Sequence, residues 1–256
     1  MKRFKIMGLC LIAAFAVTAM AASSAFATAP EFGRCLAKTG GKFSDAGCVK
    51  GVTTGGKFEW NPGPGAKPKF HSAIKAGTTA TLETVGKTKI TCTGEESPGE
   101  FKNAKEVGGI IAKFNGCKTS TFACTTTGDA VEEITTHSLG GMLGIEKLGT
   151  THATDKLAVE LHPESGPNDA EFSCAGLPVI VHGSVLHPVT SNKMLITATE
   201  KFAATAGEQK PDKFAGGPVD EHILESNTNG GPFEEAGQTI TAINTGEEKM
   251  EASSVN

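Results

Sequence analysis

The chain has 256 residues, with 24 Lys and Arg against 28 Asp and Glu, and its formal net charge is −4. Nucleic-acid binding requires a cationic face that displaces counterions from phosphates, and only one Arg, Arg34, follows the amino-terminal segment, so the charge argues against that class. Gly and Pro together make up 44 residues, which predicts many tight turns in a folded chain rather than disorder.

Residues 1–27 have the pattern of a cleavable export signal. Three cations within the first five residues precede an apolar stretch from Ile6 to Ala22, and Ala25-Phe26-Ala27 supplies the small side chains that a signal peptidase accepts. An uncleaved anchor is the alternative, because the stretch is nearly long enough to span a bilayer. Lipidation at Cys10 is disfavoured because this residue lies in the middle of the stretch. We expect cleavage after Ala27, a mature chain of net charge about −7 with no transmembrane segment, and a secreted or cell-surface location.

Residues 28–68 are predicted to form a small hairpin-like cap. The tripeptide Gly-Lys-Phe occurs twice, starting at Gly41 and Gly56, and a Pro/Gly-rich run over residues 61–68 resembles a linker. Residues 69–256 would then be the main β domain. The alternative is that residues 28–68 supply edge strands to that domain.

The clearest hairpin covers residues 79–93, where two alternating segments, TATLETV and KTKITCT, flank Gly86. Leu82, Val85, Ile90 and Cys92 are the side chains expected to point inward.

Short Thr-rich and β-branched segments follow, most of them bounded by Gly, Pro, Asn or Asp. This spacing predicts an all-β fold, either an antiparallel β-sandwich or an irregular barrel of many short strands held by disulfides. A membrane barrel is disfavoured because the chain has no Tyr and a single Trp. The predicted strands are 100–104, 107–114, 130–137, 139–148, 156–163, 170–176, 177–189, 193–204, 221–227, 238–245 and 247–253.

Six cysteines remain after cleavage, and an even number in an exported chain predicts three disulfides. Sequence alone leaves fifteen pairings open. Local spacing favours Cys35 with Cys48 and Cys117 with Cys124, which leaves Cys92 with Cys174. Zinc binding by these cysteines is disfavoured because the chain contains no C-x-x-C pair.

Catalytic and nucleotide motifs are incomplete. Residues 51–57 match the start of a phosphate-binding P-loop, but Phe58 stands where the motif needs Ser or Thr. No G-x-S-x-G elbow is present, and the loop beginning at Asn227 lacks the acidic ligands of a strong calcium site. We therefore predict no cofactor.

The histidines and paired acids are the remaining candidates for chemistry. His182 and His187 lie five residues apart, which puts them on opposite faces of a regular strand, so a metal site would have to draw on separate strands. Adjacent carboxylates on one strand likewise diverge, whereas glycoside cleavage needs two that converge. The adjacent pairs are Glu95-Glu96, Glu132-Glu133, Glu234-Glu235 and Glu247-Glu248, all expected to be solvated.

Several phrases together resemble one protein family, namely FGRC, GKFSDAGC, GGKFEWNPG, TATLETVGKTKITCTGEESPGEF and GGPFEEAGQTITA. The family comprises exported proteins present as many diverged copies in high-GC Gram-positive soil bacteria. The resemblance covers nearly all of the mature chain and is most specific around Cys35, Cys48 and Cys92. It implies export and a compact Cys-bridged β fold, and it transfers no catalytic residue.

These observations favour a non-enzymatic extracellular protein with a binding, adhesive or envelope-structural role, whose partner would be an envelope polymer or a surface protein. The alternative is a secreted polysaccharide hydrolase whose carboxylates come from separate strands.

Overall fold

The computed structural model describes residues 29–217 and 222–254, and within these ranges the chain is all-β, with a single short 3-10 turn, η1 (His152–Thr154). The predicted all-β class is confirmed, and of the two architectures expected the barrel is the correct one. The predicted export signal and its Cys10 lie outside the described ranges. No helix in the described part of the chain is long and apolar enough to cross a membrane.

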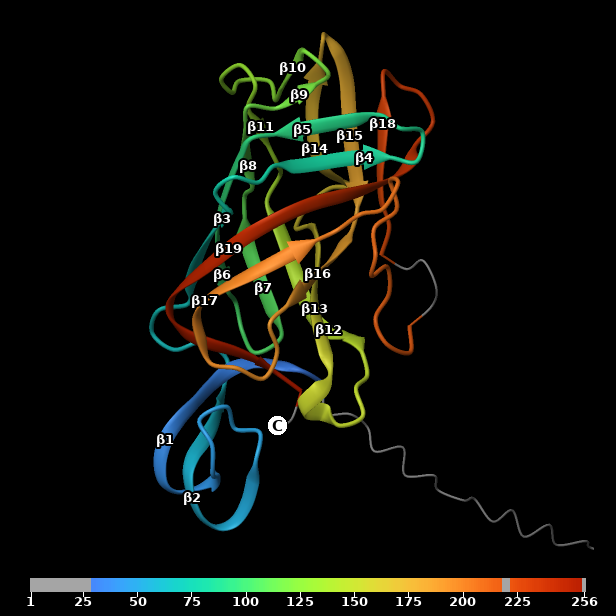
Figure 1. The fold of residues 1–256 in the computed structure, drawn as a ribbon. Helices are drawn as coiled ribbons and strands as arrows, with labels where there is room; N and C mark the ends of the chain where they lie inside the picture. The colour runs from blue at the N-terminus through green and yellow to red at the C-terminus, as the bar shows by residue number, and fades with distance from the viewer. Residues whose placement is uncertain (1–28, 218–221, 255–256) are drawn as a thin grey trace, which may run out of the picture.

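The upper part of the molecule, as drawn in Figure 1, is a closed ring of eight antiparallel strands, called the upper ring below. Each strand is hydrogen-bonded to the next, and the last returns to the first. In ring order the strands are β4 (Ala80–Thr84), β5 (Lys89–Cys92), β9 (Lys118–Thr119), β10 (Phe122–Thr125), β14 (Asn168–Cys174), β15 (Leu177–Gly183), β18 (Leu224–Thr228) and β19 (Glu234–Ser253).

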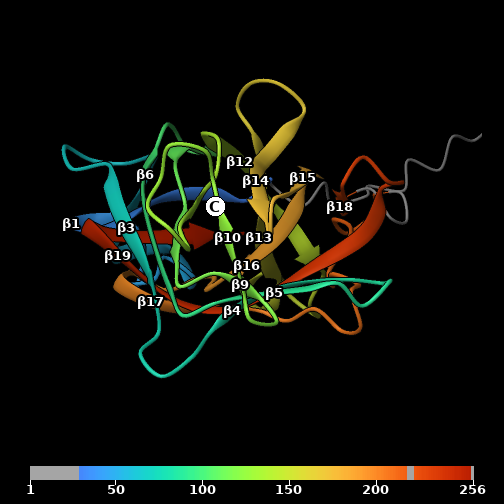
Figure 2. The same cartoon turned by 90° about the horizontal axis from the view of Figure 1, so that it is seen from above.

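Below it, a second set of eight antiparallel strands curls around a shared interior and is called the lower ring (Figures 1 and 2). Seven neighbouring pairs are hydrogen-bonded in register, and β16 lies against β17 at the remaining step. In ring order the strands are β19, β3 (Lys69–Ile74), β6 (Gly94–Phe101), β7 (Glu106–Ile110), β12 (Leu139–Lys147), β13 (Lys156–Pro163), β16 (Val185–Val189) and β17 (Leu195–Phe202).

The strand β19 belongs to both rings. Its first part pairs with β4 and β18, its middle pairs with β3 and β17, and its last three residues pair with β1 (Glu31–Phe43). Sequence reasoning predicted two strands here, 238–245 and 247–253, with Gly246 between them. They form one strand because Gly246 pairs with Phe70 of β3 and so continues the ladder.

Residues 31–62 form a two-stranded ribbon of β1 and β2 (Gly51–Pro62) at the lower end of the molecule (Figure 1). The two Gly-Lys-Phe repeats face each other in it, because Gly41 is the register partner of Gly56. A Cβ atom at either glycine would overlap the opposite backbone, which explains why both positions lack a side chain. The root of the ribbon joins the main body, since Phe32 is buried and its ring lies 4.9 Å from that of Phe101.

The hairpin predicted around Gly86 is confirmed, with Leu82 opposite Ile90. Ile90 and Cys92 are buried as expected, whereas Val85 is exposed because it already belongs to the turn.

The predicted strand 100–104 covers only the end of β6, because Pro98 interrupts the strand pattern of the preceding residues. The structure tolerates this proline because β6 pairs on one side with β8 (Lys113–Asn115) through residues 94–96 and with β7 through residues 100–101. Pro98 falls between these two pairings, where no backbone donor is needed. Conversely, the predicted strand 130–137 is reduced to β11 (Ile134–Thr135), which pairs with β8.

The described residues contain three disulfides, and only Cys35–Cys48 follows the pairing predicted from spacing. The other two are Cys92–Cys117 and Cys124–Cys174, so the expected Cys117–Cys124 and Cys92–Cys174 bridges are wrong. Cys117 and Cys124 are connected by a backbone hydrogen bond, but each side chain is bonded to a different neighbour of the β9–β10 hairpin. Cys117 is bridged to β5 and Cys124 is bridged to β14. The pairing of β5 with β9 and of β10 with β14 therefore determines the bridges.

Trypsin places these four cysteines on separate peptides, so non-reducing peptide mapping tests the pairing. We expect residues 90–102 to be linked to 114–118, and residues 119–147 to be linked to 157–193. A peptide pair joining 114–118 to 119–147 would contradict the strand order of the upper ring.

Candidate functional site

A cavity of about 290 Å³ occupies the interior of the barrel and extends between the two hydrophobic clusters. One part of its wall is aliphatic and comes from β7, β12 and β13, which contribute Val107, Leu139, Val159 and Leu161. Inward-facing positions recur every second residue on each strand, so this wall follows directly from the alternation along the strands.

The strands on the other side place polar residues in the same interior, and we call this set the polar belt. Ser97 of β6, Ser72 of β3 and Asn244 of β19 are direct register partners across three neighbouring strands. Two residues along the strands from this row lie Glu95 of β6 and Glu200 of β17. His187 of β16 lies beside Glu200. The belt consists of Ser72, Glu95, Ser97, His187, Glu200 and Asn244, all of which line the cavity.

The belt is joined by short polar contacts. Ser97 Oγ donates a hydrogen bond to Glu95 Oε1 at 2.6 Å, and Asn244 Nδ2 donates to Glu200 Oε2. His187 Nε2 lies 2.9 Å from the same Glu200 oxygen, and its ring stacks on Phe202 with centroids 4.1 Å apart. The contacts of His187 connect β16 to β17, the two neighbouring strands of the lower ring that have no backbone hydrogen-bonded pairing.

Burial shifts the protonation of the acids that face the cavity. It raises the pKa of Glu95, against the lowering effects of the Ser97 hydrogen bond and of His71 and His187. It also raises the pKa of Asp169 to about 7, and burial together with the nearby Asp45 raises that of Glu251 to about 8.

Several of these acids have oxygen atoms without a hydrogen-bond partner among the described residues. They include Glu95 Oε2, Asp169 Oδ2 and both carboxyl oxygens of Glu251, and Asn244 Oδ1, which belongs to another lining residue, is also unpartnered. Glu95 is only 7% exposed and Glu251 only 2%. Unpartnered buried polar atoms are rare in folded proteins, and their concentration along one cavity marks it as a site that can receive hydrogen bonds.

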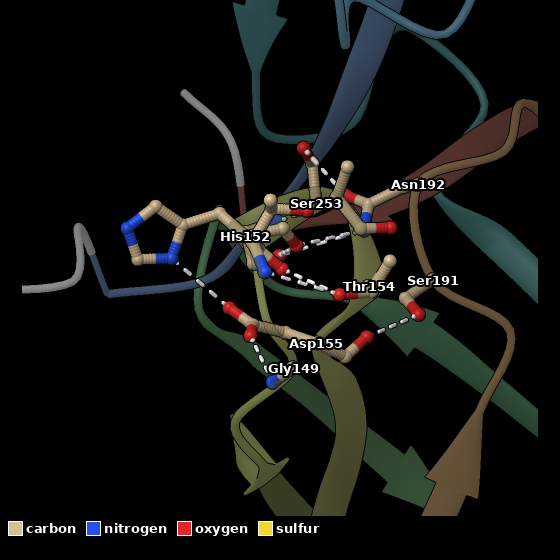
Figure 3. A network of polar contacts seen from close by, with 10 residues as sticks. Gly149, His152, Thr154, Asp155, Ser191, Asn192 and Ser253 are labelled. Carbon is tan, nitrogen blue, oxygen red and sulfur yellow. Dashed lines mark hydrogen bonds and ion pairs between the residues drawn. The ribbon is translucent and has the colours of Figure 1, made fainter.

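A second polar cluster, shown in Figure 3, has a different character. Asn192 donates to the carbonyl oxygens of His152 and Ala153 at 3.3 Å, and its own side-chain oxygen accepts from Ser253 and Ser254. These bonds attach η1 to the end of β19.

This cluster also contains the elements of a Ser-His-Asp set, but not their geometry. His152 Nδ1 lies 3.1 Å from Asp155 Oδ2, while Ser191 Oγ donates to the Asp155 carbonyl rather than to the imidazole. Figure 3 shows the His152 ring turned away from the serines. The arrangement stabilises the lower end of the barrel and offers no nucleophile next to a base.

The histidines and acid pairs singled out from the sequence are dispersed. His182 and His187 fall on β15 and β16 and belong to different rings, because the chain passes from the upper to the lower ring at Gly183, whose φ is +115°. His182 lies 2.9 Å from Glu225 and stacks on Phe233. Among the described residues, no group of three His, Cys, Asp or Glu side chains is arranged to hold a metal ion.

Of the acid pairs, Glu132 and Glu133 are paired with Lys118 and Lys113, in agreement with a solvated role. The expectation of solvation is wrong for Glu95, because alternation along β6 turns it inward while Glu96 stays exposed. Asn244, which sequence reasoning did not single out, shares one strand face with the buried Ile240 and Ala242. A single amide that follows alternating apolar residues on one strand face is the sequence feature that could have identified Asn244.

No protein-family model matches the chain, and comparison with curated proteins and with solved structures found no significant match. The resemblance to exported proteins of soil bacteria stays a prediction, and function has to be inferred from the cavity and its residues.

The raised pKa of Glu251 predicts how stability depends on pH. A carboxyl whose pKa is higher in the folded protein stabilises the fold fully below its ordinary value of 4.5, and this contribution is lost as pH rises to about 8. We expect Glu251→Gln to flatten the fall in the free energy of unfolding between pH 5 and 8, where one such group contributes a slope of up to about 1.4 kcal/mol per pH unit. Urea denaturation at several pH values measures this.

Glu247→Gln on the exposed face of the same strand is the matched control and should leave the pH profile unchanged. Identical profiles for the wild-type protein and Glu251→Gln would show that Glu251 ionises normally in the fold.

Proposed function

We propose that this is an exported, non-enzymatic binding protein that holds one small, largely apolar molecule inside its barrel. The observation that carries the proposal is the cavity, whose walls are aliphatic on one side and bear the polar belt on the other. Small-molecule sites typically combine mostly apolar walls with a few polar groups that fix the ligand's orientation. Eight-stranded barrels are of a size that can enclose one such ligand.

The volume suits a compact ligand. At about 290 Å³, the cavity is roughly twice the size of an engineered apolar cavity of ~150 Å³ that binds benzene. It favours a single compact molecule of a few rings. A polysaccharide chain needs a long open groove instead, so this volume favours ligand binding over hydrolysis of a polymer.

The disulfides support an extracellular setting for this role. All six cysteines of the described residues are bridged, and such bonds persist mainly in oxidising compartments. The bridge Cys92–Cys117 joins β5 to the residue just before β9, and Cys124–Cys174 joins β10 to β14, so both constrain the upper ring and favour a preformed interior.

Filling the cavity tests this proposal. Ala198 of β17 lines the cavity, whereas its neighbour Thr199 is exposed on the opposite face of the strand. We expect the folded protein to bind the neutral fluorophore N-phenyl-1-naphthylamine saturably and with 1:1 stoichiometry. Ala198→Phe should weaken this binding at least about tenfold, a loss of about 1.4 kcal/mol, because the new ring occupies the ligand's space.

Thr199→Phe introduces the same side chain on the outside and is the matched control, so its affinity should equal that of the wild-type protein. Equal binding by both variants, or no saturable binding by the folded wild-type protein, would contradict an interior site.

A further inference from the structure

The polar atoms left without partners along the cavity are nearly all of one kind. They are the oxygens Glu95 Oε2, Asp169 Oδ2, Asn244 Oδ1 and the two carboxyl oxygens of Glu251. Among the described lining residues, the one unpartnered nitrogen is His187 Nε2, which lies 2.9 Å from Glu200 Oε2. Asn244 Oδ1 and the ionised forms of these carboxyls can only accept hydrogen bonds, so a ligand that binds the carboxylate forms must bring hydrogen-bond donors.

The ionisable groups around the cavity show a matching excess of acids over bases. Glu95, Asp169, Glu200 and Glu251 all line it, and so does Glu248, whose Oε2 lies 3.8 Å from Nη1 of Arg34. The basic side chains of the lining are His187, whose imidazole already faces Glu200, and Lys193, which is exposed. An anionic head group beside Glu95 would find no buried lysine or arginine among the lining residues to compensate its charge, and burying unpaired charge is costly.

We propose that the ligand is a small primary amine with an apolar body, whose ammonium group is bound by Glu95 and Asn244 of the polar belt. Both residues face the interior from the polar side, and each has an oxygen atom free to accept a hydrogen bond from the ligand. The apolar body of the ligand lies against the aliphatic wall formed by Val107, Leu139 and Val159.

Pairing with a cation also resolves the unfavourable state of Glu95. Burial alone favours its neutral form, in which the carboxyl leaves Oε2 unpartnered. An ammonium group favours the carboxylate and forms charge-assisted hydrogen bonds, which are about twice as strong as neutral ones. The proposal rests on the proposed function, because it names the ligand class for the same cavity.

Three ligands with one carbon skeleton and different head groups test the ligand class: octylamine, octanol and octanoate. Each is titrated into the folded, disulfide-bonded protein near pH 7 by isothermal calorimetry and by displacement of N-phenyl-1-naphthylamine. We expect octylamine to bind at least about tenfold more tightly than octanol, and octanoate to bind most weakly.

Glu95→Gln should weaken octylamine binding at least about tenfold while octanol affinity changes less than about threefold. The retained octanol binding shows that this variant is folded with an intact cavity. Glu96→Gln, on the exposed face of the same strand, is the matched control and should bind all three ligands as the wild-type protein does.

Octanol or octanoate binding as tightly as octylamine would overturn the ligand class, and so would unchanged octylamine binding by Glu95→Gln. In these cases the neutral fluorophore still binds, and the proposed function survives. If neither the fluorophore nor any of the three ligands binds, the proposed function itself fails.

Discussion

The strand β19 is the constraint on which the rest of this structure depends. Its twenty residues pair with β4 and β18 in the upper ring, with β3 and β17 in the lower ring, and with β1 at the end. Because its side chains alternate, one register places a whole face of the strand inside the barrel. That face carries Ile240 and Ala242 into the hydrophobic interior and Asn244 into the polar belt. A slip of one residue would turn all three outward, so the fold and the cavity depend on the same pairing.

The interior contains apolar side chains whose burial stabilises the fold and polar groups whose burial destabilises it. Burial of aliphatic side chains from both rings stabilises the barrel, while Glu95, Asp169 and Glu251 are held in the same space with unpartnered oxygens. An unsatisfied buried polar group costs about 1–3 kcal/mol. The protein carries this cost at several positions along one cavity, and local departures from optimal stability are typical of functional sites. The cluster around Asn192 has the opposite character, because its groups bind one another and hold the barrel end together.

Local patterns in the sequence predict much of the secondary structure. Alternation and turn residues identify the hairpin around Gly86, and the short spacing of Cys35 and Cys48 identifies their bridge. The remaining disulfides depend on which strands become neighbours, and the pairings of β5 with β9 and of β10 with β14 join segments far apart in the chain. No local pattern determines such pairings, so spacing alone gave the wrong partners for Cys117 and Cys124.

The residues of the candidate site likewise depend on strand pairings that local sequence patterns do not determine. Alternation along β6 separates Glu95 from Glu96, but it does not say which of the two faces the interior. That choice depends on the pairing of β6 with β3, which sets Ser97 opposite Ser72 inside the barrel. For β19 the sequence carried more information, because Asn244 follows two apolar positions on one face. The polar belt as a whole draws on five strands, so it exists only once the lower ring is assembled.

Methyl NMR with bound N-phenyl-1-naphthylamine tests whether a ligand is held inside the barrel. We expect the largest shift changes and intermolecular NOEs at cavity-lining methyl groups of Val159, Val185 and Leu224. Val131 and Leu148, which are 78% and 55% exposed, should be unaffected. Contacts from the fluorophore to Val131 or Leu148, with none to the cavity methyl groups, would contradict the claim.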